Sequence, residues 1–145
     1  MDLSLRLLLN LSHNPNFRAL MVKAGLLGKL VGLFDASTPS SIVISLLYQL
    51  SIDEKNRSNQ TFVECIPALM KSILECKTEK VPVEIMACAI NIATHPNNAK
   101  LICNENGLKF LMKRALKTKD VLVFKMLRNL VQHDPAIKMM FLVSF

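Results

Sequence analysis

The chain has 145 residues, of which 51% are hydrophobic and 20% are charged, with a formal net charge of +7. This apolar content excludes a disordered tail, because disordered segments bury too little apolar surface to offset chain entropy. Four glycines, six prolines, one tyrosine and no tryptophan make an all-β sandwich, with its many turns, a poor fit. Leucine, alanine and eight methionines suit helix interfaces instead, so composition favours an all-α protein.

Secreted, zinc-binding and membrane-spanning classes fit the sequence poorly. The four cysteines form no C-x-x-C pair, so neither a zinc site nor a disulfide framework is indicated. Residues 1–12 carry an early Asp2 and an internal Arg6, which is wrong for a signal peptide. The uncharged stretch 36–52 is too polar to cross a bilayer. We therefore expect a cytoplasmic, reducing environment without membrane insertion.

Apolar periodicity predicts helices along the whole chain. In chain order the expected helices cover residues 2–12, 16–23, 26–34, 40–51, 55–63, 66–75, 82–94, 97–103, 108–116, 120–132 and 135–145. Pro39 and Pro82 suit the first turn of a helix, where a missing N–H costs nothing. Gly25 and Gly107 lie between helices, where a chain reversal can use a positive φ.

Two sequence columns repeat at nearly the same interval. Apolar residues at i, i+4, i+7 and i+8 follow each of Leu26, Ile66 and Leu108. A single amide near the end of an apolar helix recurs with the same rhythm, at Asn10, Gln49, Asn91 and Asn129. Two columns in register indicate internal repeats of three helices each.

Three-helix units of about 40 residues are typical of armadillo repeats, with two-helix HEAT repeats as the nearest alternative. We predict one right-handed armadillo superhelix over residues 1–145. It comprises a partial repeat at 1–12 (third helix), full repeats at 13–51, 52–94 and 95–132, and a partial repeat at 133–145 (first helix). Because both ends are strongly apolar, whereas terminal repeats usually carry a polar face, we expect a piece of a longer solenoid.

Several segments resemble the kinesin-associated protein family over nearly the whole chain. The most specific match is Asn-Gly-Leu-Lys-Phe-Leu-Met-Lys-Arg-Ala-Leu-Lys at 106–117, supported by Lys-Met-Leu-Arg-Asn at 125–129, Gln-His-Asp at 132–134 and the segments at 6–12 and 46–53. The resemblance implies a non-enzymatic armadillo adaptor that binds the tails of kinesin-II motor subunits and couples them to cargo adaptor proteins. It further implies a place on the microtubule cytoskeleton and in the cilium, in intraflagellar and organelle transport.

In an armadillo superhelix the third helices line the concave face, so their amides would form a ladder along a groove. An amide can pair with the backbone of an extended peptide of any sequence, because it is both donor and acceptor. The candidate groove residues are Arg6, Asn10, Ser45, Gln49, Ala87, Asn91, Lys125 and Asn129. The alternative is that the amides bridge neighbouring helix ends within the stack.

A basic patch is expected on the helix predicted over 108–116. Lys109, Lys113 and Lys117 are spaced four residues apart and therefore share one helix face, with Arg114 beside them. Charge runs of this kind are usually solvated faces; the functional reading is an acidic partner segment attracted by the local field. Nucleic acid is disfavoured because no stacking aromatics are interleaved with the basic residues.

The sequence has no Gly-rich phosphate loop, nucleophile elbow, carboxylate pair or metal-ligand cluster, so no enzyme, cofactor, metal or small-molecule substrate is predicted. The second interpretation is an unrelated armadillo adaptor that holds an extended peptide in its groove, as importins and catenins do. The tryptophans that clamp basic signals in importin-like grooves are absent from the column at Arg6, Ser45, Ala87 and Lys125. A basic RNA-binding solenoid ranks below both.

Overall fold

The computed structural model describes residues 2–35, 40–133 and 135–143. Over these ranges the chain forms twelve α-helices and no strand, which confirms the all-α prediction. The helices are α1 (Asp2–Leu11), α2 (Pro15–Lys23), α3 (Leu26–Asp35), α4 (Ser41–Ser51), α5 (Glu54–Arg57), α6 (Gln60–Glu64), α7 (Ile66–Leu74), α8 (Val83–Ile92), α9 (Pro96–Cys103), α10 (Gly107–Thr118), α11 (Val121–Gln132) and α12 (Pro135–Val143).

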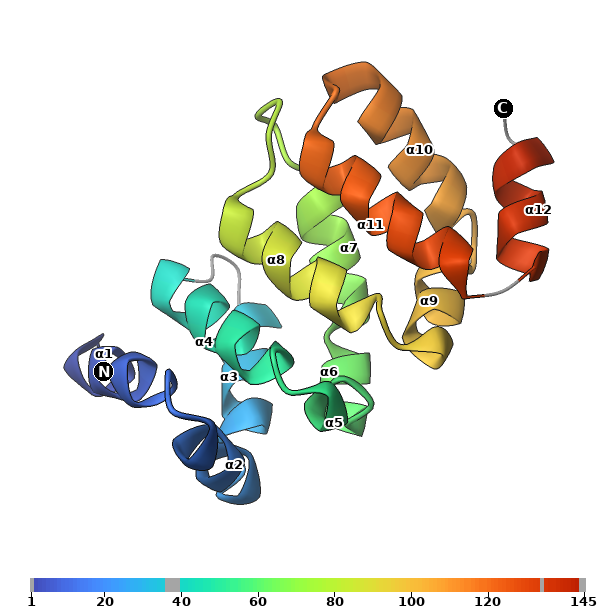
Figure 1. The fold of residues 1–145 in the computed structure, drawn as a ribbon. Coiled ribbons are helices and arrows are strands. Elements are labelled where there is room, and N and C mark those ends of the chain that lie inside the picture. The colour runs from blue at the N-terminus through green and yellow to red at the C-terminus, as the bar shows by residue number, and fades with distance from the viewer. Residues whose placement is uncertain (1, 36–39, 134, 144–145) are drawn as a thin grey trace.

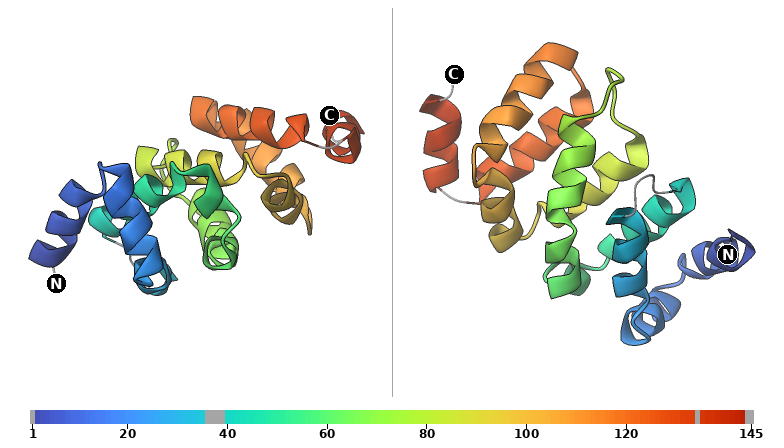
Figure 2. Two further views of the ribbon diagram at one scale, coloured as in Figure 1. Left: turned by 60° about the horizontal axis from the view of Figure 1, so that its bottom comes forward. Right: turned by 180° about the vertical axis from the view of Figure 1, so that it is seen from behind.

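The helices are stacked along one direction in two layers. One layer holds α1, α4, α8 and α11, each packed against the next in that order, and we call its open side the third-helix face. The other layer holds α3, α7 and α10, each packed beneath the helix that follows it in sequence. The two chain ends lie at opposite extremes of the molecule (Figures 1 and 2). The arrangement is an open α-helical stack and not a closed bundle.

The core runs as one continuous apolar layer between the two helix layers. Its fully buried members come from helices of both layers and include Leu30, Leu50, Ile73, Leu111 and Leu130. Each fully buried leucine or isoleucine contributes about 2 kcal/mol relative to an exposed one. Most residues of the columns at i, i+4, i+7 and i+8 face this layer because they share one side of their helices; Leu116, at the last column position of α10, is the exception and is 44% exposed.

The single helix predicted over 55–63 is wrong, since the chain forms α5 and α6 there with a break between them. Asn59 has an extended backbone, with φ −62° and ψ 131°, and its side chain accepts a hydrogen bond from the Thr61 N–H. Asparagine favours this capping geometry over the interior of a helix. Residues 53–61 contain no apolar side chain, so apolar periodicity gives no information on where the helix breaks.

The predicted glycine and proline roles are confirmed only in part. Gly25 adopts a positive φ of 82°, whereas at the equivalent turn Glu105 and Asn106 take the left-handed conformation, with φ 50° and 67°. Gly107 is the first residue of α10, and a Cβ there would collide with the Ile102 carbonyl. Glycine is therefore needed at position 107 because the backbone approaches the Ile102 carbonyl closely there, and not because the residue has a positive φ.

Where the structure describes them, prolines begin α2, α9 and α12 and stand in the first turn of α7, but none lies within the first turn of a predicted third helix. Pro82 is the extended N-cap of α8, outside its first turn, and Pro39 lies outside the described residues. Pro15 and Pro96 occupy the first positions of α2 and α9, where the fixed φ of proline suits the helix start.

Candidate partner-binding surfaces

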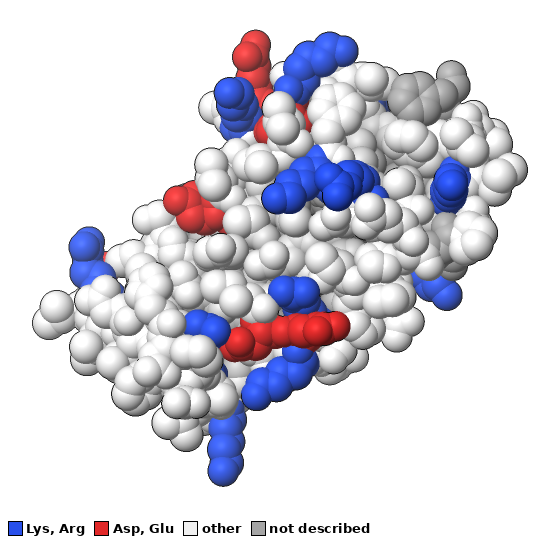
Figure 3. All heavy atoms as spheres, viewed as in Figure 1, with Lys and Arg blue, Asp and Glu red and all other residues white. Residues whose placement is uncertain are grey.

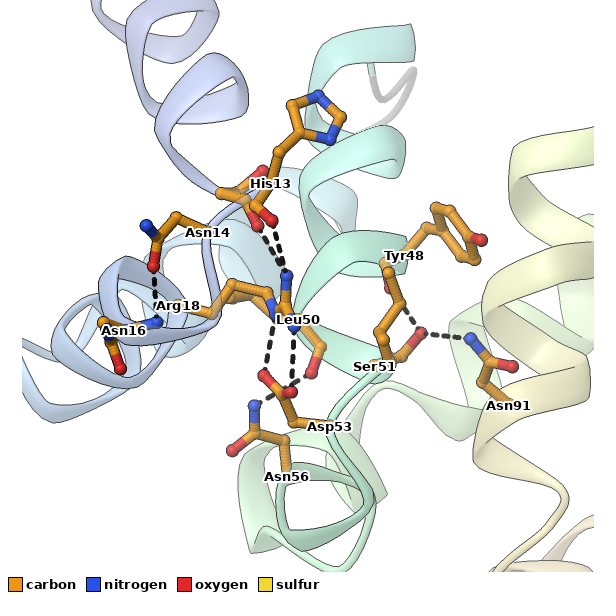
Figure 4. A network of polar contacts seen from close by, with 12 residues as sticks. His13, Asn14, Asn16, Arg18, Tyr48, Leu50, Ser51, Asp53, Asn56 and Asn91 are labelled. Carbon is orange, nitrogen blue, oxygen red and sulfur yellow. Dashed lines mark hydrogen bonds and ion pairs between the residues drawn. The ribbon is translucent and has the colours of Figure 1, made fainter.

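Arg18 ties three segments together at the first joint between units. Its Nε and Nη2 donate to the two carboxylate oxygens of Asp53 at 2.8 and 3.0 Å, while Nη1 donates to the carbonyls of Ser12 and His13 at 2.9 and 3.3 Å (Figure 4). The hydrogen bonds from the guanidinium lower the pKa of Asp53, and the carboxylate raises the pKa of Arg18. The guanidinium and the carboxylate are therefore both used in contacts within the fold.

A similar set of arginine hydrogen bonds recurs at the next joint, where Arg57 takes the place of Arg18. Arg57 donates from Nε to the Ser51 carbonyl at 2.8 Å, from Nη2 to the Ile52 carbonyl at 2.9 Å and from Nη1 to Thr94 Oγ1 at 2.9 Å. Asn98 Nδ2 adds bonds to the Arg57 and Ile92 carbonyls at 2.7 and 3.1 Å. These side chains satisfy carbonyls that a helix end leaves without partners, so they hold the stack together.

The four amides of the predicted ladder belong to α1, α4, α8 and α11, and they have different surroundings. Asn10 on α1 is exposed, while Gln49, Asn91 and Asn129 are half-buried on α4, α8 and α11. Asn91 Nδ2 donates to Ser51 Oγ at 3.1 Å across the α4–α8 interface (Figure 4). This contact is the bridging role that was the alternative for the amides.

The column one turn earlier is equally varied. Arg6 is exposed and forms a 3.0 Å ion pair with Asp2 on its own helix. Lys125 is exposed on α11, and Ser45 and Ala87 are half-buried on α4 and α8.

Three of the predicted groove residues are brought together in one cavity. Ser45, Gln49 and Ala87 line a hollow of about 380 Å³ together with Leu9, His13, Tyr48, Val83 and Glu84. The cavity therefore lies where α1, α4 and α8 meet, and the lining does not include the predicted residues Arg6, Asn10, Asn91, Lys125 and Asn129. Sequence reasoning missed Tyr48 and Glu84, although Glu84 precedes Ala87 by three residues and shares its helix face.

The four residues of the predicted basic patch on α10 differ in their exposure and in their contacts. Lys109, Lys113 and Lys117 are exposed, as the spacing predicts. Arg114 is half-buried and donates from Nη1 to the Cys76 carbonyl at 2.8 Å and from Nη2 to the Thr78 carbonyl at 2.9 Å. Arg114 thus fixes the loop of residues 75–82, and the three lysines are left to face solvent or a partner.

A protein-family model described as kinesin-associated protein (KAP) matches residues 1–144. The chain belongs to the kinesin-associated protein family. This membership confirms the resemblance carried by residues 106–117 and the other matching segments. It gives the chain an accessory role associated with kinesin.

The cysteine thiols of this kinesin-associated chain differ in burial and in the direction of their pKa shifts. In the described part of the chain no three His, Cys, Asp or Glu side chains come together as a metal-ligand group. Burial raises the pKa of Cys103 to about 11 and also raises that of Cys88. At Cys76 partial burial acts in the same direction, but hydrogen bonds with Thr78 and the nearby Arg114 charge outweigh it and lower the pKa.

Charge is distributed unevenly over the third-helix side of this family member. Basic side chains stand out over α11, and basic and acidic ones together around the loop that leads into α8, whereas the surface over α4 is largely uncharged (Figure 3). No helix in the described ranges is long and apolar enough to span a membrane. The surfaces open to a partner are therefore a weakly charged cavity on the third-helix face and a basic region at α10.

Proposed function

We propose that this chain is a run of armadillo units in a non-enzymatic accessory subunit that binds the tails of kinesin-II motor subunits and couples them to cargo adaptor proteins. The single observation that carries the proposal is the family match over residues 1–144. The units are those spaced by the two sequence columns, at 13–51, 52–94 and 95–132, with partial units at 1–12 and 133–145, stacked in a right-handed superhelix. The place of action is the cytoplasm, on microtubules and in the cilium.

The interaction surface in this proposal is the third-helix face. Its cavity at Ser45, Gln49 and Ala87 offers hydroxyl and amide groups beside the exposed apolar Val83. A mixed surface of this kind suits a protein segment that contributes both apolar contacts and backbone hydrogen bonds. The joints at Arg18 and Arg57 keep successive third helices in register and so keep this surface in shape.

The test is direct binding of the purified chain to recombinant coiled-coil tail segments of the two kinesin-II motor subunits, measured by calorimetry. We expect saturable binding that weakens about tenfold when Gln49→Ala and Glu84→Ala are combined, because each lost polar contact costs about 0.5–1.5 kcal/mol. Lys29→Ala is the matched control: Lys29 is exposed on α3, in the other helix layer, so its replacement should leave the affinity unchanged.

Three outcomes would contradict the proposal. These are no binding of the tails, preferential capture of a basic nuclear-localisation peptide, and retention of RNA that falls steeply with salt, as phosphate contacts require. If the tails bind and the double variant is unaffected, the accessory function stands and the assignment to this face is wrong.

A further inference from the structure

A second open cavity lies on the other side of the molecule, between α10 and the loop that joins α7 to α8. It has a volume of about 480 Å³, and Leu74 and Phe110 supply its apolar surface. Its basic lining residues are Lys77, Lys113, Arg114 and Lys117, against the single acidic residue Glu79. The loop rises beside the C-terminal end of α10 (Figure 1).

The wall of this cavity is held in place by the protein's own contacts. Arg114 binds the carbonyls of Cys76 and Thr78, and Thr78 Oγ1 donates to the Lys80 carbonyl at 2.8 Å. The guanidinium is therefore used within the fold. By contrast, Lys77, Lys113 and Lys117 are exposed and form no ion pair with any described residue, so their charge is available to a ligand.

An apolar cavity of about 410 Å³ continues from the basic one. The two share Leu74 and Phe110, and the second is lined further by Ile66, Pro67, Met70 and Leu101. Asn104 and Glu105 also line it, so its few polar groups include an acidic one and no basic one. Phe110 is 50% exposed and Leu101 45% exposed, which leaves large apolar side chains open to water. We call this combined depression the α7–α10 trough: one half is apolar, the other half is basic, and Phe110 stands where they meet.

We propose that the α7–α10 trough is a docking site for a protein segment in which apolar side chains are followed by acidic ones. Apolar side chains of the segment bury the open surface of Phe110 and Leu101, which supplies affinity. The acidic side chains meet Lys77, Lys113 and Lys117, which supplies orientation and selectivity through complementary charge. The site lies on the layer opposite the third-helix face, so the inference goes beyond the proposed motor-tail contact and does not depend on it.

A protein segment fits the trough better than nucleic acid does. The apolar half extends over α7 and α9 without basic residues among its lining, whereas a nucleic acid needs cations along its whole backbone track. Phe110 is the single aromatic in the lining of either half, and single-strand binders use successive aromatics as stacking platforms.

The primary test uses a fluorescein-labelled peptide with an apolar half of Leu and Phe residues and an acidic half of Glu residues, titrated with the intact chain. We expect saturable binding, and a loss of about tenfold or more for Lys113→Glu combined with Lys117→Glu, since both attractions become repulsions. Lys109→Glu is the matched control: Lys109 is exposed on the same helix but does not line the trough, so it should change affinity less than twofold.

A charge-swapped peptide separates docking from general attraction. With Lys in place of Glu, it should bind the Lys113→Glu/Lys117→Glu variant more tightly than it binds the unmodified chain. A peptide with Ser in place of Leu and Phe should bind the unmodified chain weakly, as should the original peptide with the Phe110→Ala variant. The substituted lysines are exposed and Phe110 is partly so, and thermal unfolding of each variant verifies its fold.

Cys76 gives an independent readout of location. It lines the trough and is half-buried, whereas Cys65, Cys88 and Cys103 are buried, and thiolate character governs alkylation. The bound peptide should slow the reaction of Cys76 with N-ethylmaleimide several-fold. The proposal is overturned if the peptide does not bind, if binding leaves Cys76 unprotected, if the lysine variants bind it equally well, or if a single-stranded RNA of equal charge binds the trough more tightly.

Discussion

Arg18 and Asp53 lie 35 residues apart in sequence and form a two-point ion pair, with N–O distances of 2.8 and 3.0 Å. Their side chains are only 8% and 21% exposed. The pair joins α2 to the N-cap of α5 in the following unit, while the same arginine caps the carboxyl end of α1. One side chain thus sets the spacing of three segments.

The contribution of this pair can be measured with a double-mutant cycle. Asp53→Ala should lower the free energy of unfolding by about 3 kcal/mol, because it leaves the Arg18 charge buried without its partner. The coupling energy with Arg18→Met should exceed about 1.5 kcal/mol. The pair Asp2–Arg6, with side chains 67% and 64% exposed, is the control and should couple by less than about 0.5 kcal/mol. Equal coupling of the two pairs in urea unfolding would show that burial does not strengthen the joint.

The same pair predicts a pH dependence of stability. The pKa of Asp53 is lowered in the folded state by its hydrogen bonds with Arg18, so the stabilisation is complete above the unfolded value of about 3.9. It is lost as the pH falls through the lower, folded value, because the unfolded state then binds the proton more readily. The difference in unfolding free energy between the unmodified chain and Asp53→Ala should be constant from about pH 7 to pH 5 and shrink towards pH 2. A difference that grew on acidification would contradict this sign.

Most of the helical architecture could be predicted, because it depends on apolar periodicity. Predicted and observed ends agree within one or two residues for α3, α4 and α7, where Leu, Ile and Val columns recur without interruption. The break at Asn59 could not be found in this way, since it depends on one side chain competing for the Thr61 N–H. The repeats also contain a pattern that could have predicted the two arginine joints. Arg18 follows Asn10 by the same number of residues as Arg57 follows Gln49.

For the candidate surface residues, spacing predicts the helix on which each lies but not the contacts that its side chain makes. Asn91 lies on a helix that periodicity predicts, yet its bond to Ser51 depends on how α8 packs on α4, which no spacing specifies; its place in a binding groove stays a prediction. Arg114 looked like a member of the basic stripe because it adjoins Lys113. Its bonds to the 75–82 loop depend on the conformation of a segment with no periodic pattern, and the same loop creates one half of the α7–α10 trough.

Asp120 should be a more sensitive helix cap than Ser40. It is buried, and its carboxylate accepts hydrogen bonds from the Leu122 N–H at 3.1 Å, at the start of α11, and from the buried Val81 N–H at 3.0 Å, in the preceding unit. Asp120→Ala removes a cap worth about 1 kcal/mol and leaves a buried donor unpaired, at a further cost of about 1–3 kcal/mol. We expect a total loss of about 3 kcal/mol in denaturant unfolding.

Ser40 is the matched control for this prediction. It caps α4 by accepting from the Val43 N–H at 3.3 Å and is exposed, so Ser40→Ala should cost about 1 kcal/mol or less. If Asp120→Ala costs no more than Ser40→Ala, the bond to Val81 across the units contributes nothing to the stability of the stack.

Gly107 and Gly32 should respond in opposite directions to the same substitution. At Gly107 the added methyl would collide with the Ile102 carbonyl, so α10 must shift against α9, and we expect Gly107→Ala to destabilise the fold by about 2 kcal/mol. Gly32 is exposed within α3 with nothing within 4 Å of an added Cβ. Gly32→Ala should therefore stabilise by about 0.5–1 kcal/mol, since alanine loses less backbone entropy in a helix. Thermal unfolding of the two variants distinguishes these effects: a Gly107→Ala chain that melts at or above the temperature of the unmodified chain would show that α9 and α10 do not require this close approach.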